Sequence, residues 1–183
     1  MWIRRGWEPI SLRPQRGLPG ASGGRQTAAV VDYELAQVNI ARLLAPLDDP
    51  QLKDFVENLA PVNAAADAAL GFVWRLETDE GNATSIEAFT WDAAGSVGVI
   101  VNLSVWVDLD HLLAFVYAPE HRAVLRRRRE WFAPMAQAYT ACWWVPAGQR
   151  PTTQDAEDRV RWLRDHGPTG YAFGPRDPFP PPG

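Results

Sequence analysis

Amide and hydroxyl side chains lie on one face of two segments that have the alternating pattern of β-strands, residues 33–40 and 97–107. A small-molecule site needs an apolar wall that binds the ligand and a few polar groups that orient it. Amides and hydroxyls that converge on a cavity also suit the stabilisation of an enolate or phenolate oxyanion. We therefore expect a ligand cavity on this face. Its residues are Gln37 and Asn39 in the first segment and Asn102, Ser104 and Trp106 in the second.

Aromatic residues of a third strand segment, residues 72–77, extend the same face. Phe72 and Trp74 are two residues apart, which places both on one side of a regular strand. We assign them to ligand binding together with Gln37, Asn39 and Ser104. A second interpretation is open, in which Asn39 and Asn102 only hydrogen-bond across a dimer interface.

Two histidines are candidates for acid–base chemistry. His121 shares a helical period with Leu125 and Phe132, which predicts that its ring points inward and acts as a general base with a pKa near the working pH. His111 is expected to be a solvated or capping residue. The sequence leaves open which of the two faces the cavity.

Patterns for metals and nucleotide cofactors are missing from the sequence. The chain has three dispersed histidines and one cysteine without ligand spacing, and no Gly-rich phosphate loop follows a strand. We therefore expect no metal and no cofactor. The run Arg126–Arg129 covers one helical turn, so its side chains point in different directions. One or two of them could reach a carboxylated ligand at the cavity mouth.

These residues are positioned by a predicted order of strand, helix, strand, strand, helix, strand, with one helix and one strand appended. The helices are marked by an amphipathic period, by turn and capping residues such as Asp108 and Thr152 or Thr153, and by Pro119 at a first turn. The predicted strands are residues 33–40, 72–77, 97–107, 138–145 and 170–173, and the predicted helices run from about 50 to 71, from 108, from 119 through 132 and from 153 to 166.

This order is typical of the α+β class with a ferredoxin-like split βαβ topology and an antiparallel sheet. Helices then cover one sheet face, and the other face, with Trp106, needs a partner because large exposed apolar patches are rare. We expect a homodimer that packs sheet against sheet.

The two ends of the chain differ from the part between them. Residues 1–30 hold five arginines and one glutamate, although the whole chain has a net charge of −4. This segment has no periodic pattern and is predicted to be a flexible basic extension. Scattered arginines are a weak nucleic-acid footprint, so no nucleic-acid partner is expected. The domain is predicted to span residues 31–176, followed by a Pro-rich tail at 177–183.

Composition excludes several classes of protein. With 183 residues, 46% hydrophobic and 22% charged, the chain is long enough for one globular core and too apolar for disorder. The longest apolar run, Val97 to Val107, is broken by Asn102 and Ser104, so no membrane span is expected. One cysteine and the lack of an apolar leader favour a reducing cytoplasm.

Several segments resemble the dimeric α/β-barrel superfamily, which includes antibiotic-biosynthesis monooxygenases and haem-degrading monooxygenases. The strand-then-helix signature is Asn102-Leu103-Ser104-Val105-Trp106, Asp110 to Phe115 and Ala118 to Arg122. A closer resemblance, to a bacterial domain-of-unknown-function family in this superfamily, covers about residues 33–180. It is carried by Ala36 to Ala41, Gly71 to Leu76, Asn82 to Ile86, Arg126 to Phe132 and Trp143 to Gly148.

The resemblance implies site residues only where this sequence matches. Cofactor-independent oxygenases of the superfamily use an Asn and a Trp four residues apart on a cavity strand, which Asn102 and Trp106 match, but their Tyr would fall near Leu112. Asn39 matches an Asn that the haem degraders use on their first strand. Phe115 and Leu125 stand where those enzymes have a Trp and the haem-binding His, so haem binding is the weaker implication.

The predicted function is therefore that of a dimeric small-molecule protein. With Asn102, Trp106 and His121 as catalytic residues, it would be a cofactor-independent monooxygenase or isomerase for an aromatic or polyketide-like metabolite. The alternative is a non-catalytic dimeric ligand-binding or accessory protein. The sequence does not identify the substrate.

Overall fold

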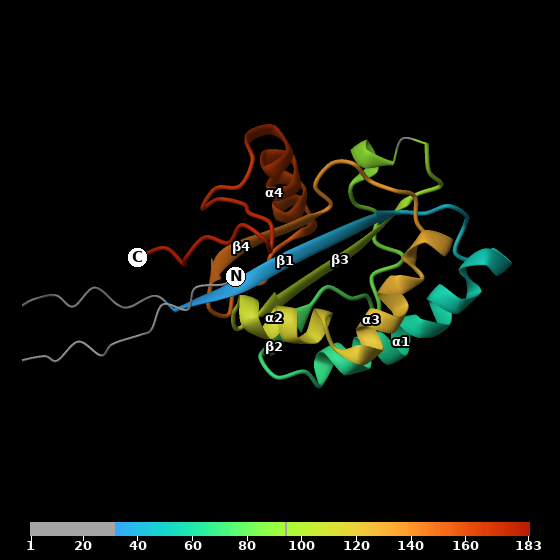
Figure 1. The fold of residues 1–183 in the computed structure, drawn as a ribbon, viewed down its shortest axis with the longest axis horizontal. Coiled ribbons are helices and arrows are strands. Elements are labelled where there is room, and N and C mark those ends of the chain that lie inside the picture. Colours follow the sequence, from blue (N-terminus) through green and yellow to red (C-terminus); the bar gives the residue numbers. More distant parts are fainter. Residues whose placement is uncertain (1–31, 94) are drawn as a thin grey trace, which may run out of the picture. The chain divides into compact units, whose positions relative to one another are not determined.

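The structure is a computed structural model that describes residues 32–93 and 95–183 (Figure 1). The predicted basic extension, residues 1–30, lies outside the described residues. Within the described ranges, no helix is long and apolar enough to cross a membrane. The strands are β1 (Tyr33–Arg42), β2 (Phe72–Arg75), β3 (Val99–Trp106) and β4 (Thr140–Pro146), and the helices are α1 (Lys53–Asp67), α2 (Leu109–Val116), α3 (Pro119–Arg126) and α4 (Thr153–His166).

The four strands form one open antiparallel sheet in the order β2-β3-β1-β4. This order, with α1 after β1 and with α2 and α3 between β3 and β4, confirms the ferredoxin-like split βαβ topology. The pairing of β1 with β3 places Asn39 opposite Asn102 and Gln37 opposite Ser104. The polar residues predicted to share a face are therefore neighbours across two strands.

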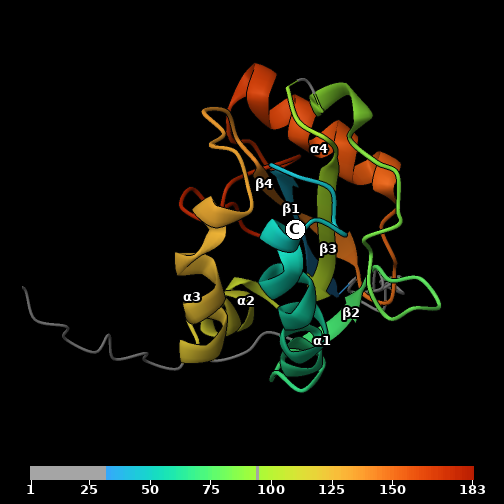
Figure 2. The ribbon, with the colours of Figure 1, turned by 90° about the vertical axis from the view of Figure 1, so that its right-hand side faces the viewer.

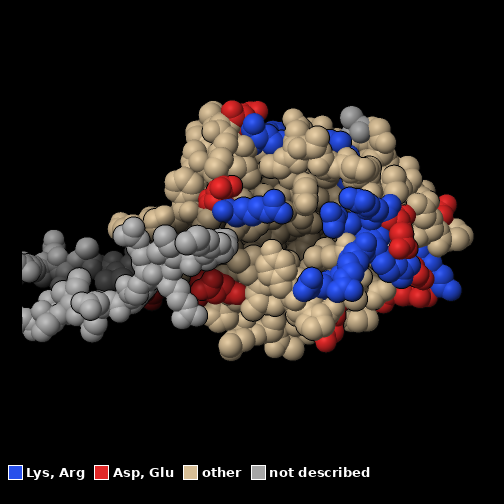
Figure 3. All heavy atoms as spheres, viewed as in Figure 1, with Lys and Arg blue, Asp and Glu red and all other residues tan. Residues whose placement is uncertain are grey.

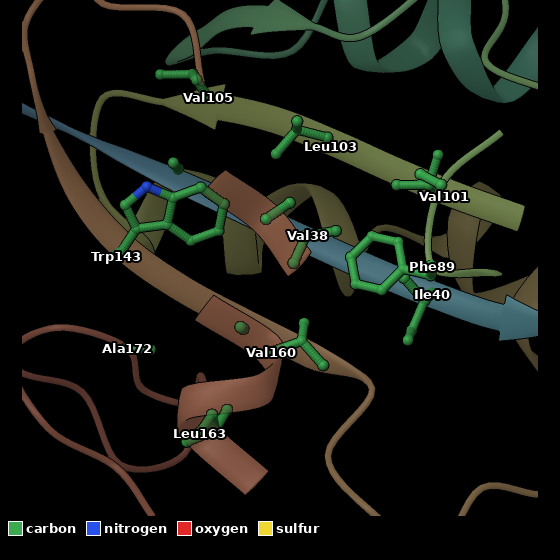
Figure 4. Close-up of a cluster of buried hydrophobic side chains, with 14 of the residues drawn as sticks. Val38, Ile40, Phe89, Val101, Leu103, Val105, Trp143, Val160, Leu163 and Ala172 are labelled. Carbon is green, nitrogen blue, oxygen red and sulfur yellow. The ribbon is translucent and has the colours of Figure 1, made fainter. Parts of the chain in front are cut away.

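The appended helix α4 covers the aliphatic sheet face. The side chains of Val38, Val101, Leu103 and Trp143 pack there against the α4 stripe that contains Val160 (Figure 4). The sequence explains why α4 forms here. Thr152 and Asp155 make a reciprocal capping box at its start, and Gly167 at φ 73° ends it.

The face that carries Trp106 is covered as well, by the helices on the other side of the sheet (Figure 2). Trp106 is 1% exposed and packs against Phe72 and Phe115, at ring-centroid distances of 5.4 and 5.2 Å. The prediction that this face is open and exposes Trp106 was wrong. The amphipathic stripes of α1 and α2 cover it within one chain.

The predicted interface of the homodimer is therefore not available, because helices of the same chain cover the part of the sheet face around Trp106. The homodimer stays a prediction of the sequence, and its two chains would have to contact each other through another surface. Size-exclusion chromatography with light scattering checks it, and we expect a mass of twice the 20.4 kDa chain at micromolar concentration. A mass equal to one chain would contradict the homodimer.

Two predicted elements differ from the structure. Helix α3 ends at Arg126 instead of reaching Phe132, which pairs with Leu43 as an isolated bridge. Residues 170–173 form a single bridge, from Phe173 to Cys142, rather than a strand.

The Pro-rich end of the chain lies against the domain. The indole nitrogen of Trp144 donates to the Phe179 carbonyl at 2.8 Å. Tertiary contacts decide all three features.

A buried ion-pair cluster joins the sheet to α4. The carboxylate of Asp92, which is 4% exposed, accepts from Arg42 at 2.8 Å and from Arg164 at 2.7 Å. Burial alone raises the pKa of Asp92, but hydrogen bonds and charge from Arg164 and Arg42 outweigh it, so the pKa lies below its ordinary value. The cluster fixes the loop before β3 against α4.

Candidate functional site

A cavity of about 170 Å³ lies between the sheet and helices α1 and α3. A dry cavity of ~150 Å³ is large enough for benzene, so this one fits a ligand of about one or two rings. Its floor is Asn39, Ala41, Ile100 and Asn102, its walls include Phe55, Leu59 and Val62 of α1 and His121, Val124 and Leu125 of α3, and Trp131 and Phe132 also line it. The lining is mostly apolar, as in ligand sites generally.

Two amides form the polar part of the floor. One N–H of the Asn39 amide donates to the Thr140 hydroxyl at 2.8 Å, and its second N–H makes no hydrogen bond within the described residues. The exposed Asn102 side chain makes no hydrogen bond within the part of the chain that the structure describes. Of the two floor amides, Asn102 is thus the one whose side chain is not used in hydrogen bonds that hold the fold. We call it the uncommitted amide.

His121, on the first turn of α3, also lines the cavity. Its Nδ1 lies 3.0 Å from the Val116 carbonyl oxygen, and because a carbonyl only accepts, Nδ1 carries the hydrogen. The neutral ring therefore has its lone pair on Nε2. Burial lowers the pKa of His121 from its ordinary value, and the hydrogen bond to Val116 acts in the opposite direction. A neutral imidazole of fixed tautomer is a competent general base.

The His121 ring is held by aromatic packing. Its centroid lies 4.8 Å from that of Phe115, which stacks on Trp106. Trp106 does not line the cavity, so the structure places this predicted catalytic residue behind His121 instead of against a ligand. Its indole nitrogen donates to the Ser104 hydroxyl at 3.0 Å.

Two predicted ligand-binding residues, Gln37 and Ser104, are also outside the cavity lining. Both are buried, and the Ser104 hydroxyl donates to the Gln37 side-chain oxygen at 3.2 Å. Their polar groups are used inside the sheet–helix core, where an unpaired hydroxyl or amide would be costly. The alternation correctly placed them on the same face as the cavity, but the helices cover that part of the face.

Phe72 and Trp74 do not line the cavity either. A register irregularity between them in the β2–β3 pairing breaks the strict alternation of side chains. Phe72 packs with Trp106, whereas Trp74 packs against the opposite, α4-covered cluster. The prediction that both residues share the cavity face was wrong for this reason.

Sequence reasoning missed several lining residues because they come from helices and loops. Asn58 and Asn63 flank the apolar stripe of α1, and Trp131, which is 1% exposed, lies just beyond α3. Trp131 is thus the tryptophan whose fluorescence can report on ligand binding, because Trp74 and Trp106 do not line the cavity. The available signal was that each asparagine is next to an apolar residue of the α1 stripe, Asn58 to Leu59 and Asn63 to Val62.

Two arginines line the cavity and differ in their partners. Arg75 donates to Asp67 and to the Gly81 carbonyl and pairs with Glu77, so its charge is compensated. Arg128 makes one long contact, 3.5 Å to the Leu125 carbonyl. In the ranges 32–93 and 95–183, no cluster of three or more His, Cys, Asp or Glu could hold a metal ion. The single cysteine is inert, because burial raises the pKa of Cys142 to about 12.

One comparison with known proteins identifies the family of the chain. The profile of the family described as "Domain of unknown function (DUF3291)" matches residues 34–183. No curated protein matches the chain.

Two solved structures are similar at low identity. One is a mutant of SnoaB, described as a cofactor-independent oxygenase from Streptomyces nogalater, at 17% identity and a TM-score of 0.38, covering 64% of this chain and 95% of that one. The other is the NE2512 protein of unknown function from Nitrosomonas europaea, at 14% identity and a TM-score of 0.38, covering 66% and 97%.

Proposed function

This chain belongs to the family described as domain of unknown function DUF3291, and from that premise we propose a function drawn from its cavity. The protein is an enzyme that removes a proton from a small aromatic or polyketide-like metabolite. His121 is the base, and Asn102 with Asn39 stabilises the resulting anion. The observation that carries the proposal is that a base of fixed tautomer and an uncommitted amide line the same apolar cavity.

The chemistry follows from these groups. Nε2 of His121 accepts a proton from an acidic C–H or O–H, and the substrate becomes an enolate or phenolate. Amide N–H groups on the floor donate hydrogen bonds to the developing oxyanion. These hydrogen bonds stabilise the anion more in a cavity of low polarity than they would in water. The apolar walls hold the ring in place.

Two outcomes are open to this anion. In an isomerase, the proton returns from the imidazolium to a different atom of the substrate. In a cofactor-independent monooxygenase, the electron-rich carbanion reduces O₂, so that a CH₂ group becomes C=O and the second oxygen atom leaves as water. Both begin with the same proton transfer, which is the step assigned to this chain.

Proton abstraction can be tested without knowing the natural substrate. Aromatic ketones with an acidic C–H, such as 2-tetralone and anthrone, are incubated with the protein in D₂O, and the loss of the C–H signal is followed by NMR. Binding is followed by quenching of Trp131, with Trp131→Phe as the control for the reporter. We expect protein-catalysed exchange and, for some ketones, O₂ uptake. Saturable binding without exchange or O₂ uptake would favour the non-catalytic ligand-binding protein.

Asn102→Ala is expected to weaken ligand binding or turnover by about 10-fold, which corresponds to ~1.4 kcal/mol, and to change the melting temperature little. The reason is that the Asn102 amide has no partner in the described structure and faces the cavity. Melting and affinity are measured on the same sample. Asn39→Ala is the matched control, because it also removes the hydrogen bond to Thr140 and should lower stability. A large stability loss in Asn102→Ala with unchanged affinity would assign Asn102 a structural role.

A further inference from the structure

Four residues on one side of α3 and of the turn after it line the cavity. His121, Val124, Leu125 and Arg128 are spaced i, i+3, i+4 and i+7, the spacing of one helical face, and all four line the cavity. The ends of this stripe are polar and its middle is apolar. The base and the guanidinium therefore stand at opposite ends of the stripe, with the apolar Val124 and Leu125 between them.

Arg128 pairs with no carboxylate among the described residues, in contrast to Arg127 and Arg75. Arg127 pairs with Asp54 at 2.6 Å and with Glu130 at 2.7 Å, so its charge is compensated, and it does not line the cavity. Arg75, at the far wall, is neutralised by Asp67 and Glu77. Among the described lining residues, Arg128 is therefore the cation that an anionic ligand can use.

The surface agrees with this assignment. Lys and Arg side chains gather over α3 and the turn after it, beside a hollow on this face of the molecule (Figure 3). The chain as a whole is acidic, with a net charge of −4. A local basic patch on an acidic protein steers anions towards its own position.

We propose that the ligand of this cavity is an aromatic monocarboxylic acid whose carboxylate binds Arg128 at the mouth. Its ring packs on Val124 and Leu125, and its acidic C–H or O–H group lies towards His121. A guanidinium binds a carboxylate through two parallel N–H donors, and a single arginine matches one negative charge rather than the two of a phosphate monoester. The inference rests on the proposed cavity function and adds the substrate class.

Matched acids and esters test the assignment by isothermal titration calorimetry. The probes are benzoate, phenylacetate and 2-naphthoate, each compared with its methyl ester, which has the same ring and no charge. We expect at least one acid to bind about 10-fold or more tightly than its ester. Arg128→Ala should remove this preference and leave the affinity of the ester unchanged.

The control is Arg129→Ala, because Arg129 is the next arginine in the same turn and does not line the cavity. It removes the same charge and should keep the acid-to-ester ratio within about 2-fold. Equal binding of acid and ester to the wild type, or an equal loss in both variants, overturns the carboxylate inference alone. If neither member of any pair binds, the cavity function fails as well.

Discussion

His121→Asn is expected to lower kcat/KM for the exchanging ketones by at least ~100-fold and to leave their affinity within about 3-fold. Asn is chosen because its side-chain N–H can keep donating to the Val116 carbonyl, as Nδ1 of His121 does. The amide cannot accept a proton. Initial rates of deuterium exchange and binding titrations on the same variant separate the two quantities.

The pH dependence gives an independent check on the base. Burial lowers the pKa of His121 below its ordinary value of 6.5, so the neutral, proton-accepting form predominates above that lowered pKa. We expect kcat/KM to be constant through neutral pH and to fall as the pH drops through a value below 6.5. The acid limb should be absent from the residual rate of His121→Asn.

His111→Gln is the matched control, because the His111 ring contacts the cap residue Asp108 at 2.7 Å and does not line the cavity. Its exchange rate should stay within about 2-fold of the wild type. Full activity in His121→Asn, or an acid limb that persists in it, would show that another group is the base.

Asp92→Asn is expected to destabilise the domain by about 3–5 kcal/mol, the usual cost of removing one partner from a buried ion pair. The substitution keeps the shape of the side chain but leaves the guanidinium groups of Arg42 and Arg164 beside a neutral amide. For a chain of this size the melting temperature should fall by roughly 10 °C. Thermal and urea unfolding measure the change.

The stabilisation by Asp92 also depends on pH. Because the folded-state pKa lies below the ordinary 3.8, this carboxylate stabilises the fold above pH ~4, and the contribution is lost as the pH falls through the lower, folded-state value. Asp92→Asn should flatten the fall of stability in that acid window.

Asp67→Asn is the control for Asp92→Asn. Asp67 also pairs with an arginine, Arg75, but its side chain is 45% exposed, and exposed pairs contribute less than ~1 kcal/mol. A loss of stability in Asp92→Asn no larger than that in Asp67→Asn would contradict the structural role of the buried cluster.

The elements of the fold could be predicted from local patterns. Alternation marked β1 and β3, and the caps Asp108 and Thr152 marked the starts of α2 and α4. The same patterns gave the order that defines the split βαβ topology. Such signals are local, because burial of one strand or helix face needs a period in the sequence and a cap needs a hydrogen-bonding side chain at one position.

The sequence by itself determined the sheet, the family and three cavity residues, Asn39, Asn102 and His121. Only the tertiary structure decided which polar groups on the cavity face stay open to a ligand. Packing against the sheet buries Trp106 and Ser104 and leaves Asn102 exposed. It also decided the position of Trp74, since an irregularity in strand pairing cannot be read from alternation alone. Which arginine is uncompensated depends on carboxylates brought close by folding, as Asp54 is to Arg127.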